Sequence, residues 1–172
     1  MAGVPKFNPG GVPLGARLAR FASTRLLHEW SQLQPWEAPP VYEVRLGPTP
    51  LTSSPGIITP AQENMLRNFN RYADMIGITA HEIQVIEAKM QFDPGAISQV
   101  LHYVDLVHYT PLLREFSGRM VVPVILVAFN DPGLHQRAAA QGIRVIQYTP
   151  SWASDWLVKR YGAKKILADS AD

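Results

Sequence analysis

The sequence predicts an α/β fold, in which helices flank both faces of a mixed central sheet and an extended proline-rich arm comes first. Three observations predict it. Strand and helix patterns alternate from residue 59 onward, the segment 121–129 is apolar on both faces and is followed by a second expected buried strand over 143–148, and ten of the fifteen prolines lie in the first sixty residues. Strands that are apolar throughout are typical of a sheet covered on both sides, whereas closely spaced prolines prevent a continuous helix or central strand.

Composition narrows the classes of function. The 172 residues suit one ordinary domain with extensions, and 47% are hydrophobic, so a core can form. The absence of cysteine excludes disulfides, thiolate nucleophiles and cysteine-ligated metal centres. A formal net charge of +2 does not by itself indicate a nucleic-acid-binding protein. No apolar run approaches the roughly 18 residues of a membrane span, so we expect no transmembrane segment and no membrane partner.

Residues 1–58 are expected to form the arm, with one amphipathic helix over 14–34 and a strand over 41–46. An arm of this kind suits the surface of a neighbouring subunit, so we expect a protein partner or a homo-oligomer. Two alternatives stay open. One is a partly disordered tail, and the other is an organelle transit peptide, because four basic residues and no acidic ones precede Glu29.

Residues 59–172 are expected to form the main domain. It begins with a helix over about 60–70, which has a capping threonine and a proline at its first position. Two short apolar segments follow, 72–78 and 83–90, and the polar turn between them favours an antiparallel hairpin.

Caps and periodicity predict the remaining elements. Asp93 precedes a proline and caps a helix over 96–109. The elements expected after it are a short helix over 111–116, the strand 121–129, a helix that ends at Gly142, the strand 143–148 and a terminal helix over 151–161. Helices that connect strands in this order cover both faces of a mixed sheet.

Polar residues in the expected hairpin indicate a site for chemistry. Glu87 and Lys89 are two apart on a strand, so their side chains point to one face. Asp74 lies in the preceding strand, and the short turn allows it to approach Glu87. Two carboxylates that converge repel each other, and a hard cation such as Mg²⁺ or Mn²⁺ resolves that repulsion. A lysine beside them can orient or deprotonate a water and offset the charge of a phosphate.

These residues also resemble a known family. Asp74, followed after twelve residues by the Glu-Ala-Lys of 87–89, resembles the D and E-x-K of the PD-(D/E)XK nuclease superfamily. Gln99 and Tyr103, on the next expected helix, are similar to the Q-x-x-x-Y element of its RecB-like branch. A spacing of four puts this pair on one helical face. The resemblance covers roughly residues 65–152 and implies a restriction-endonuclease-like core.

The resemblance implies a hydrolase that binds DNA and cleaves its phosphodiester bonds with Mg²⁺ or Mn²⁺, as an endonuclease or an exonuclease. Asp74 and Glu87, with a nearby backbone carbonyl, would hold the metal, and Lys89 would position the water. Gln99 and Tyr103 would support the site or contact the substrate. Guesses for phosphate contacts are Arg71, Arg114 and Lys159.

The sequence departs from the family pattern at two points. The residue before Asp74 is alanine rather than proline, a variation that the superfamily tolerates. Many members carry a further metal-binding glutamate upstream, and Glu63 on the helix before the hairpin is the candidate, with Glu43 in the earlier strand as the alternative.

A function of another class stays open. A structural or assembly protein, for example of a virus particle, could be built on a nuclease-like fold and bind neighbouring subunits through its arm. The low net charge and the proline-rich arm favour it, whereas the complete set of Asp74, Glu87 and Lys89 favours activity. The expected location is cytoplasmic or virion-associated rather than secreted. Serine hydrolysis and phosphate-loop chemistry have no motif in the sequence.

Overall fold

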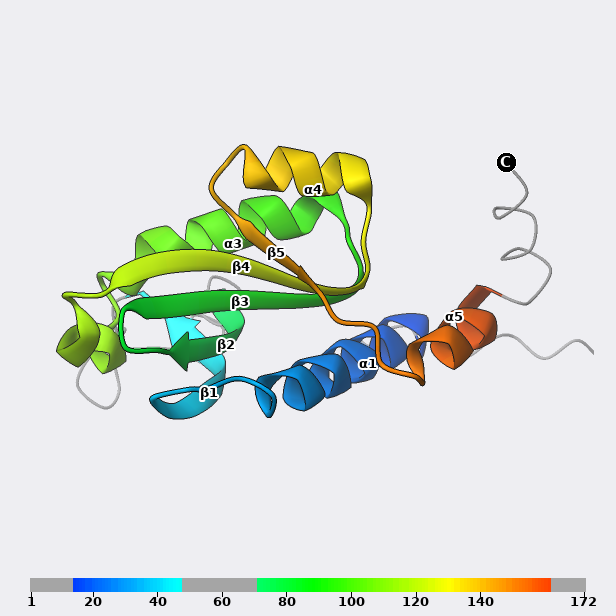
Figure 1. Ribbon diagram of the computed structural model, residues 1–172, viewed down its shortest axis with the longest axis horizontal. Helices are drawn as coiled ribbons and strands as arrows, with labels where there is room; N and C mark the ends of the chain where they lie inside the picture. Colours follow the sequence, from blue (N-terminus) through cyan, green and yellow to red (C-terminus); the bar gives the residue numbers. More distant parts are fainter. Residues whose placement is uncertain (1–13, 48–70, 162–172) are drawn as a thin grey trace, which may run out of the picture.

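The structure is a computed structural model that describes residues 14–47 and 71–161 (Figure 1). In chain order its elements are α1 (Leu14–Ser31), β1 (Ala38–Leu46), β2 (Arg71–Ile78), β3 (Glu82–Gln91), α3 (Pro94–Val107), the 3₁₀ helix η1 (Pro111–Phe116), β4 (Met120–Phe129), α4 (Pro132–Ala139), β5 (Arg144–Gln147) and α5 (Ala153–Tyr161). The helix expected over 60–70 and the candidate Glu63 lie outside the described residues.

The five strands form one mixed sheet in the order β1-β2-β3-β4-β5 (Figure 1). Strands β1, β2 and β3 pair antiparallel, and β3, β4 and β5 pair parallel. The expected α/β class and mixed sheet are therefore confirmed, as is the hairpin of β2 and β3. Asp93 also caps α3 as expected, since its side chain accepts a hydrogen bond from the backbone N–H of Ala96.

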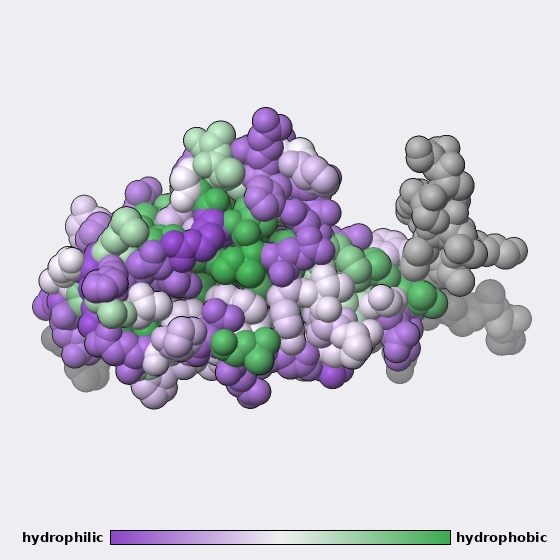
Figure 2. All heavy atoms as spheres, viewed as in Figure 1, coloured by the Kyte–Doolittle hydropathy of each residue, from purple (hydrophilic) through white to green (hydrophobic). Residues whose placement is uncertain are grey.

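Helices cover both faces of the sheet, so it has two cores (Figure 1). Helices α3 and α4 pack on one face, where the α3-side core includes Val44, Ala73, Ile76, Val85, Ile97, Val100 and Val127. Helices α1 and α5 lie on the other face, where the α1-side core includes Leu26, Trp30, Met75, Ile86, Ala88, Leu126 and Ala153. In Figure 2, polar residues cover most of the visible face, and apolar residues gather over its middle, where the later strands lie.

The described part of the expected arm belongs to this same structure. Strand β1 is an edge strand of the sheet, and an edge position tolerates the consecutive prolines Pro39 and Pro40. The register of β1 on β2 shifts between Ala38 and Val41, where these prolines lie. Helix α1 contributes Leu26 and other buried residues to a core. The boundary expected at residue 58 lies outside the described residues.

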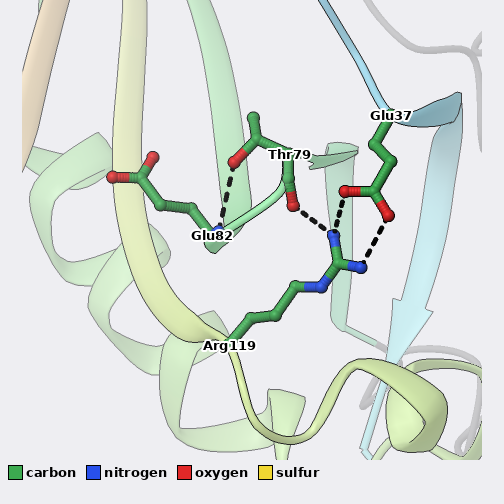
Figure 3. A network of polar contacts seen from close by, with 4 residues as sticks. All are labelled: Glu37, Thr79, Glu82 and Arg119. Atoms are coloured by element: carbon green, nitrogen blue, oxygen red, sulfur yellow. Dashed lines mark hydrogen bonds and ion pairs between the residues drawn. The ribbon is translucent and has the colours of Figure 1, made fainter.

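Arg119, which precedes β4, ties three segments together at one end of the sheet (Figure 3). Its guanidinium donates to both carboxylate oxygens of Glu37, at 3.0 and 2.9 Å, and also to the backbone carbonyl of Thr79. In the turn between β2 and β3, the Thr79 hydroxyl accepts a hydrogen bond of 3.1 Å from the backbone N–H of Glu82. These bonds connect the start of β1, the hairpin turn and the approach to β4.

Gly77 in β2 lies against the ring of Trp36. A Cβ added at Gly77 would lie 2.3 Å from Cζ3 of this ring, and the ring is held because Trp36 Nε1 donates to the carbonyl of Ser31 at 2.8 Å. We expect Gly77→Ala to lower the free energy of unfolding by about 1–3 kcal/mol through overpacking. Urea denaturation measures it, with Gly118→Ala as control because its added Cβ meets nothing within 4 Å. Equal, small effects of both variants would contradict this packing.

Candidate functional site

Strands β2 and β3 separate at the end of the hairpin that is remote from its turn. Their backbone pairing ends at Met75 opposite Ile86, whereas β1 stays paired with β2 as far as the first residue of β2. Past the last β2–β3 pair, the backbone N–H of Ala88 donates to Oδ2 of Asp74 at 2.8 Å. A carboxylate therefore occupies the place of a partner strand, and the sheet opens between β2 and β3.

Glu43 on β1 and Asp74 on β2 lie opposite each other. They are between the regular pairs of Tyr42 with Met75 and of Val44 with Ala73. The neighbours of Glu43 lie on different faces, because Tyr42 packs on the α1-side core and Val44 belongs to the α3-side core. Residues two apart on a regular strand share a face, so the strand twists sharply here. Glu43 has a φ of 49°, a conformation that L side chains rarely adopt and that is more frequent near functional sites.

Glu87 is the most buried acidic residue of the opening, with 3% of its surface exposed. Its Oε1 accepts a hydrogen bond from Nζ of Lys89 at 2.6 Å. Its other oxygen, Oε2, is buried without a hydrogen-bond partner in the described structure. A buried acceptor without a partner costs free energy, and such an atom in a native structure calls for an explanation, for example a ligand.

The burial of these groups shifts their pKa values. Burial, reinforced by the neighbouring Asp74 carboxylate, raises the pKa of Glu87 to about 7 in spite of Lys89. Burial also raises the pKa of Asp74, against the hydrogen bond from Ala88. Burial alone would lower the pKa of Lys89, but the Glu87 and Asp74 carboxylates outweigh it and raise it. A cation bound between the two carboxylates would favour their ionised forms and so lower both pKa values.

The five residues expected to act in the reaction come together in one cavity of about 570 Å³, whose lining includes Asp74, Glu87, Lys89, Gln99 and Tyr103. Strands β2 and β3 supply the charged residues. Helix α3 supplies Gln99, which is exposed, and Tyr103, which is 6% exposed. A volume of this size is ordinary for a ligand site.

The cavity has further walls, of which the sequence had indicated only Glu43, as an alternative metal-binding acid. Helix α1 contributes Arg20, Thr24 and His28, and β1 contributes Tyr42 and Glu43. The rings of His28 and Tyr42 stack with centroids 4.1 Å apart and planes at 21°. The spacing of four between the three helical residues could have revealed a polar face of α1, but no local pattern indicates that α1 lies across the sheet opening.

Two of the residues suggested as phosphate contacts are not found in the lining of the cavity. Arg114 on η1 and Lys159 on α5 are exposed and do not line it. The side chain of Arg71 is not among those that the structure describes. Glu43, the alternative to Glu63 as an upstream acid, does line the cavity.

The donor set suits a cation that needs few protein ligands. In the part of the chain that the structure describes, no three His, Asp or Glu side chains are grouped to hold a metal ion. Mg²⁺ usually keeps several waters and binds through one or two carboxylates. The unpartnered Oε2 of Glu87, beside the Asp74 carboxylate, fits this requirement.

Comparisons with known proteins found no family model, curated protein or solved structure that matches this chain. The expected membership of a nuclease superfamily therefore stays a prediction that rests on the residues themselves. Among the described helices, none has the length and apolar character needed to cross a membrane.

Proposed function

We propose that this protein is a metal-dependent nuclease that hydrolyses phosphodiester bonds of DNA at the opening between β2 and β3. One observation carries the proposal. Asp74, Glu87 and Lys89 line one cavity, where Oε2 of Glu87 is buried without a hydrogen-bond partner in the described structure. An acidic pair can hold a divalent cation, and a lysine beside it can offset negative charge on a phosphate, which together suit metal-assisted phosphodiester hydrolysis.

Asp74 and Glu87 would hold Mg²⁺ or Mn²⁺, with the backbone carbonyl of Ala88 as a third oxygen. When bound, such a cation polarises the phosphodiester and makes water a stronger nucleophile. Asp74 is kept in position by the backbone N–H of Ala88, and Glu87 by the contact with Lys89. The two carboxylates are thus oriented before any ligand arrives, which lowers the cost of binding.

Lys89 acts as a cation in this proposal. Although burial opposes its charge, the Glu87 and Asp74 carboxylates raise its pKa above the ordinary value, so it is an ammonium at neutral pH. It donates hydrogen bonds to the attacking water or to a phosphate oxygen and offsets the negative charge that develops there. Gln99 and Tyr103, on the α3 wall of the cavity, orient the substrate.

The proposal is tested by incubating the full chain with linear duplex, circular duplex and single-stranded DNA in Mg²⁺, Mn²⁺ or EDTA. We expect cleavage of at least one substrate in a divalent cation and none in EDTA. Cleavage of circles identifies an endonuclease, and cleavage confined to linear DNA identifies an exonuclease. Intact DNA in every mixture would contradict the proposal.

One observation favours the assembly function as a second candidate. Lys89 contacts Glu87 at 2.6 Å, and a static structural ion pair would have the same geometry. An inactive fold of this kind would release no heat when Mn²⁺ is titrated in, and it would leave DNA intact.

A further inference from the structure

Arg20 is a basic residue of α1 at the entrance to the acidic cavity. It borders a smaller hollow of about 170 Å³ together with Glu43, Tyr72, Ala73 and Asp74, and it also lines the main cavity. Its side chain is 79% exposed and makes an ion pair with Glu43, in which Nη2 lies 3.0 Å from Oε1. The guanidinium is therefore held near Asp74 and remains open to solvent.

A polyanionic substrate needs positive charge at this place. Asp74, Glu87 and Glu43 bring three carboxylates to the cavity, and Lys89 is engaged by Glu87. Arg20 is the remaining Lys or Arg among the described residues that line it. A guanidinium has a planar set of donors that fits two phosphate oxygens at once. Arg20 therefore has the charge and the chemistry of a phosphate-binding group.

The present partner of Arg20 is easily replaced. The contact joins one guanidinium nitrogen to one carboxylate oxygen, and both side chains are largely exposed, at 79% and 70%. An ion pair in this setting is weak, and a phosphate oxygen can take the position of the carboxylate oxygen. The backbone of Glu43 is part of β1, so displacing its carboxylate requires a movement of the exposed side chain only.

We infer that Arg20 binds a backbone phosphate of the nucleic-acid substrate, and that Glu43 occupies this position when no substrate is present. The inference rests on the proposed function. It makes Glu43 an internal competitor of the substrate rather than a metal ligand. It also gives α1 a part in substrate binding, as the helix that carries the phosphate contact to the cavity.

The test is the binding of a short fluorescent single-stranded oligonucleotide to the full chain, followed by anisotropy in EDTA and again in Ca²⁺ over a range of salt concentrations. We expect Arg20→Gln to weaken binding about fivefold and to reduce the slope of log affinity against log salt by about 0.7, the value for one lost phosphate contact. We expect Glu43→Gln to strengthen binding about twofold to fivefold, because it removes the competing partner.

Arg25→Gln is the matched control. Arg25 is on the same helix and also pairs with a carboxylate, Glu29, at 2.8 Å, but it does not line the cavity. If Arg20→Gln and Arg25→Gln lower the affinity for the oligonucleotide equally, Arg20 contributes only to the overall positive charge, and the inference is overturned. An unchanged or weakened affinity of Glu43→Gln would overturn the competition.

These results are distinguishable from a failure of the nuclease proposal, because anisotropy measures binding without cleavage. A reduced salt slope for Arg20→Gln alone supports the phosphate contact even if no substrate is cut. If the wild type cleaves DNA but Arg20→Gln leaves the slope of log affinity against log salt unchanged, the nuclease proposal stands and the phosphate contact of Arg20 is rejected.

Discussion

Asp74→Asn and Lys89→Gln are each expected to lower the rate of metal-dependent DNA cleavage at least about a hundredfold. Asparagine retains an oxygen that can accept the hydrogen bond from Ala88, now made to Oδ2 of Asp74, but it removes the negative charge that a cation needs. Glutamine at 89 retains a donor for Glu87 but removes the positive charge beside the phosphate. The measurement is the single-turnover cleavage rate at saturating enzyme with Mn²⁺.

Matched charge removals outside the cavity serve as controls. Asp155→Asn on α5 and Arg137→Gln on α4 alter exposed residues that do not line the cavity, and we expect cleavage within about twofold of the wild type, because exposed substitutions away from such a site have small effects. Thermal unfolding of all four variants separates a lost activity from a lost fold. Near-normal cleavage by folded Asp74→Asn or Lys89→Gln would remove these residues from the reaction.

Glu87→Gln is expected to change how stability depends on pH. The pKa of Glu87 is raised to about 7 in the folded protein, so the folded state holds a proton that the unfolded state has lost above its ordinary pKa. The free energy of unfolding therefore falls as pH rises through this window, and the loss is complete above pH 7. Without a cation, the Glu87 contribution between pH 5 and pH 8 is on the order of 2–3 kcal/mol.

Urea denaturation at pH 5 and pH 8, in EDTA and in Mn²⁺, measures this contribution. In EDTA we expect the wild type to lose stability between the two pH values and Glu87→Gln to lose less. At pH 8 we expect Mn²⁺ to stabilise the wild type, because the ion binds the folded state alone, and not the variant. Glu115→Gln, at an exposed position on η1, is the control. If the free energy of unfolding of the wild type and of Glu87→Gln changes equally with pH, the ionisation of buried Glu87 is not the cause of the change.

Local patterns predicted much of the fold, because its elements carry their own start and stop residues. Asp93 caps α3, and the apolar β4 lies in the interior of the sheet. The alternation along β3 correctly separated Glu87 and Lys89 from Ile86 and its neighbours, which pack in the α1-side core. Short-range geometry was sufficient for these features, since side chains two apart on a strand share a face.

The wall formed by α1 could not be predicted in the same way. The ion pair of Arg20 with Glu43 spans 23 positions of the chain, and the contact of Trp36 with Gly77 also depends on the docking of distant segments. The positive φ of Glu43 has no local cue, because glycine or asparagine is the usual residue there. These features follow from tertiary packing, which the spacing of residues does not encode.

The most direct test of the central claim is calorimetric titration of Mn²⁺ into the wild type and into the Asp74→Asn/Glu87→Gln double variant at pH 8. The account predicts saturable binding to the wild type and none to the double variant, with both proteins folded by circular dichroism. Absence of binding to the wild type, or equal binding to both proteins, would contradict a cation site at the opening between β2 and β3.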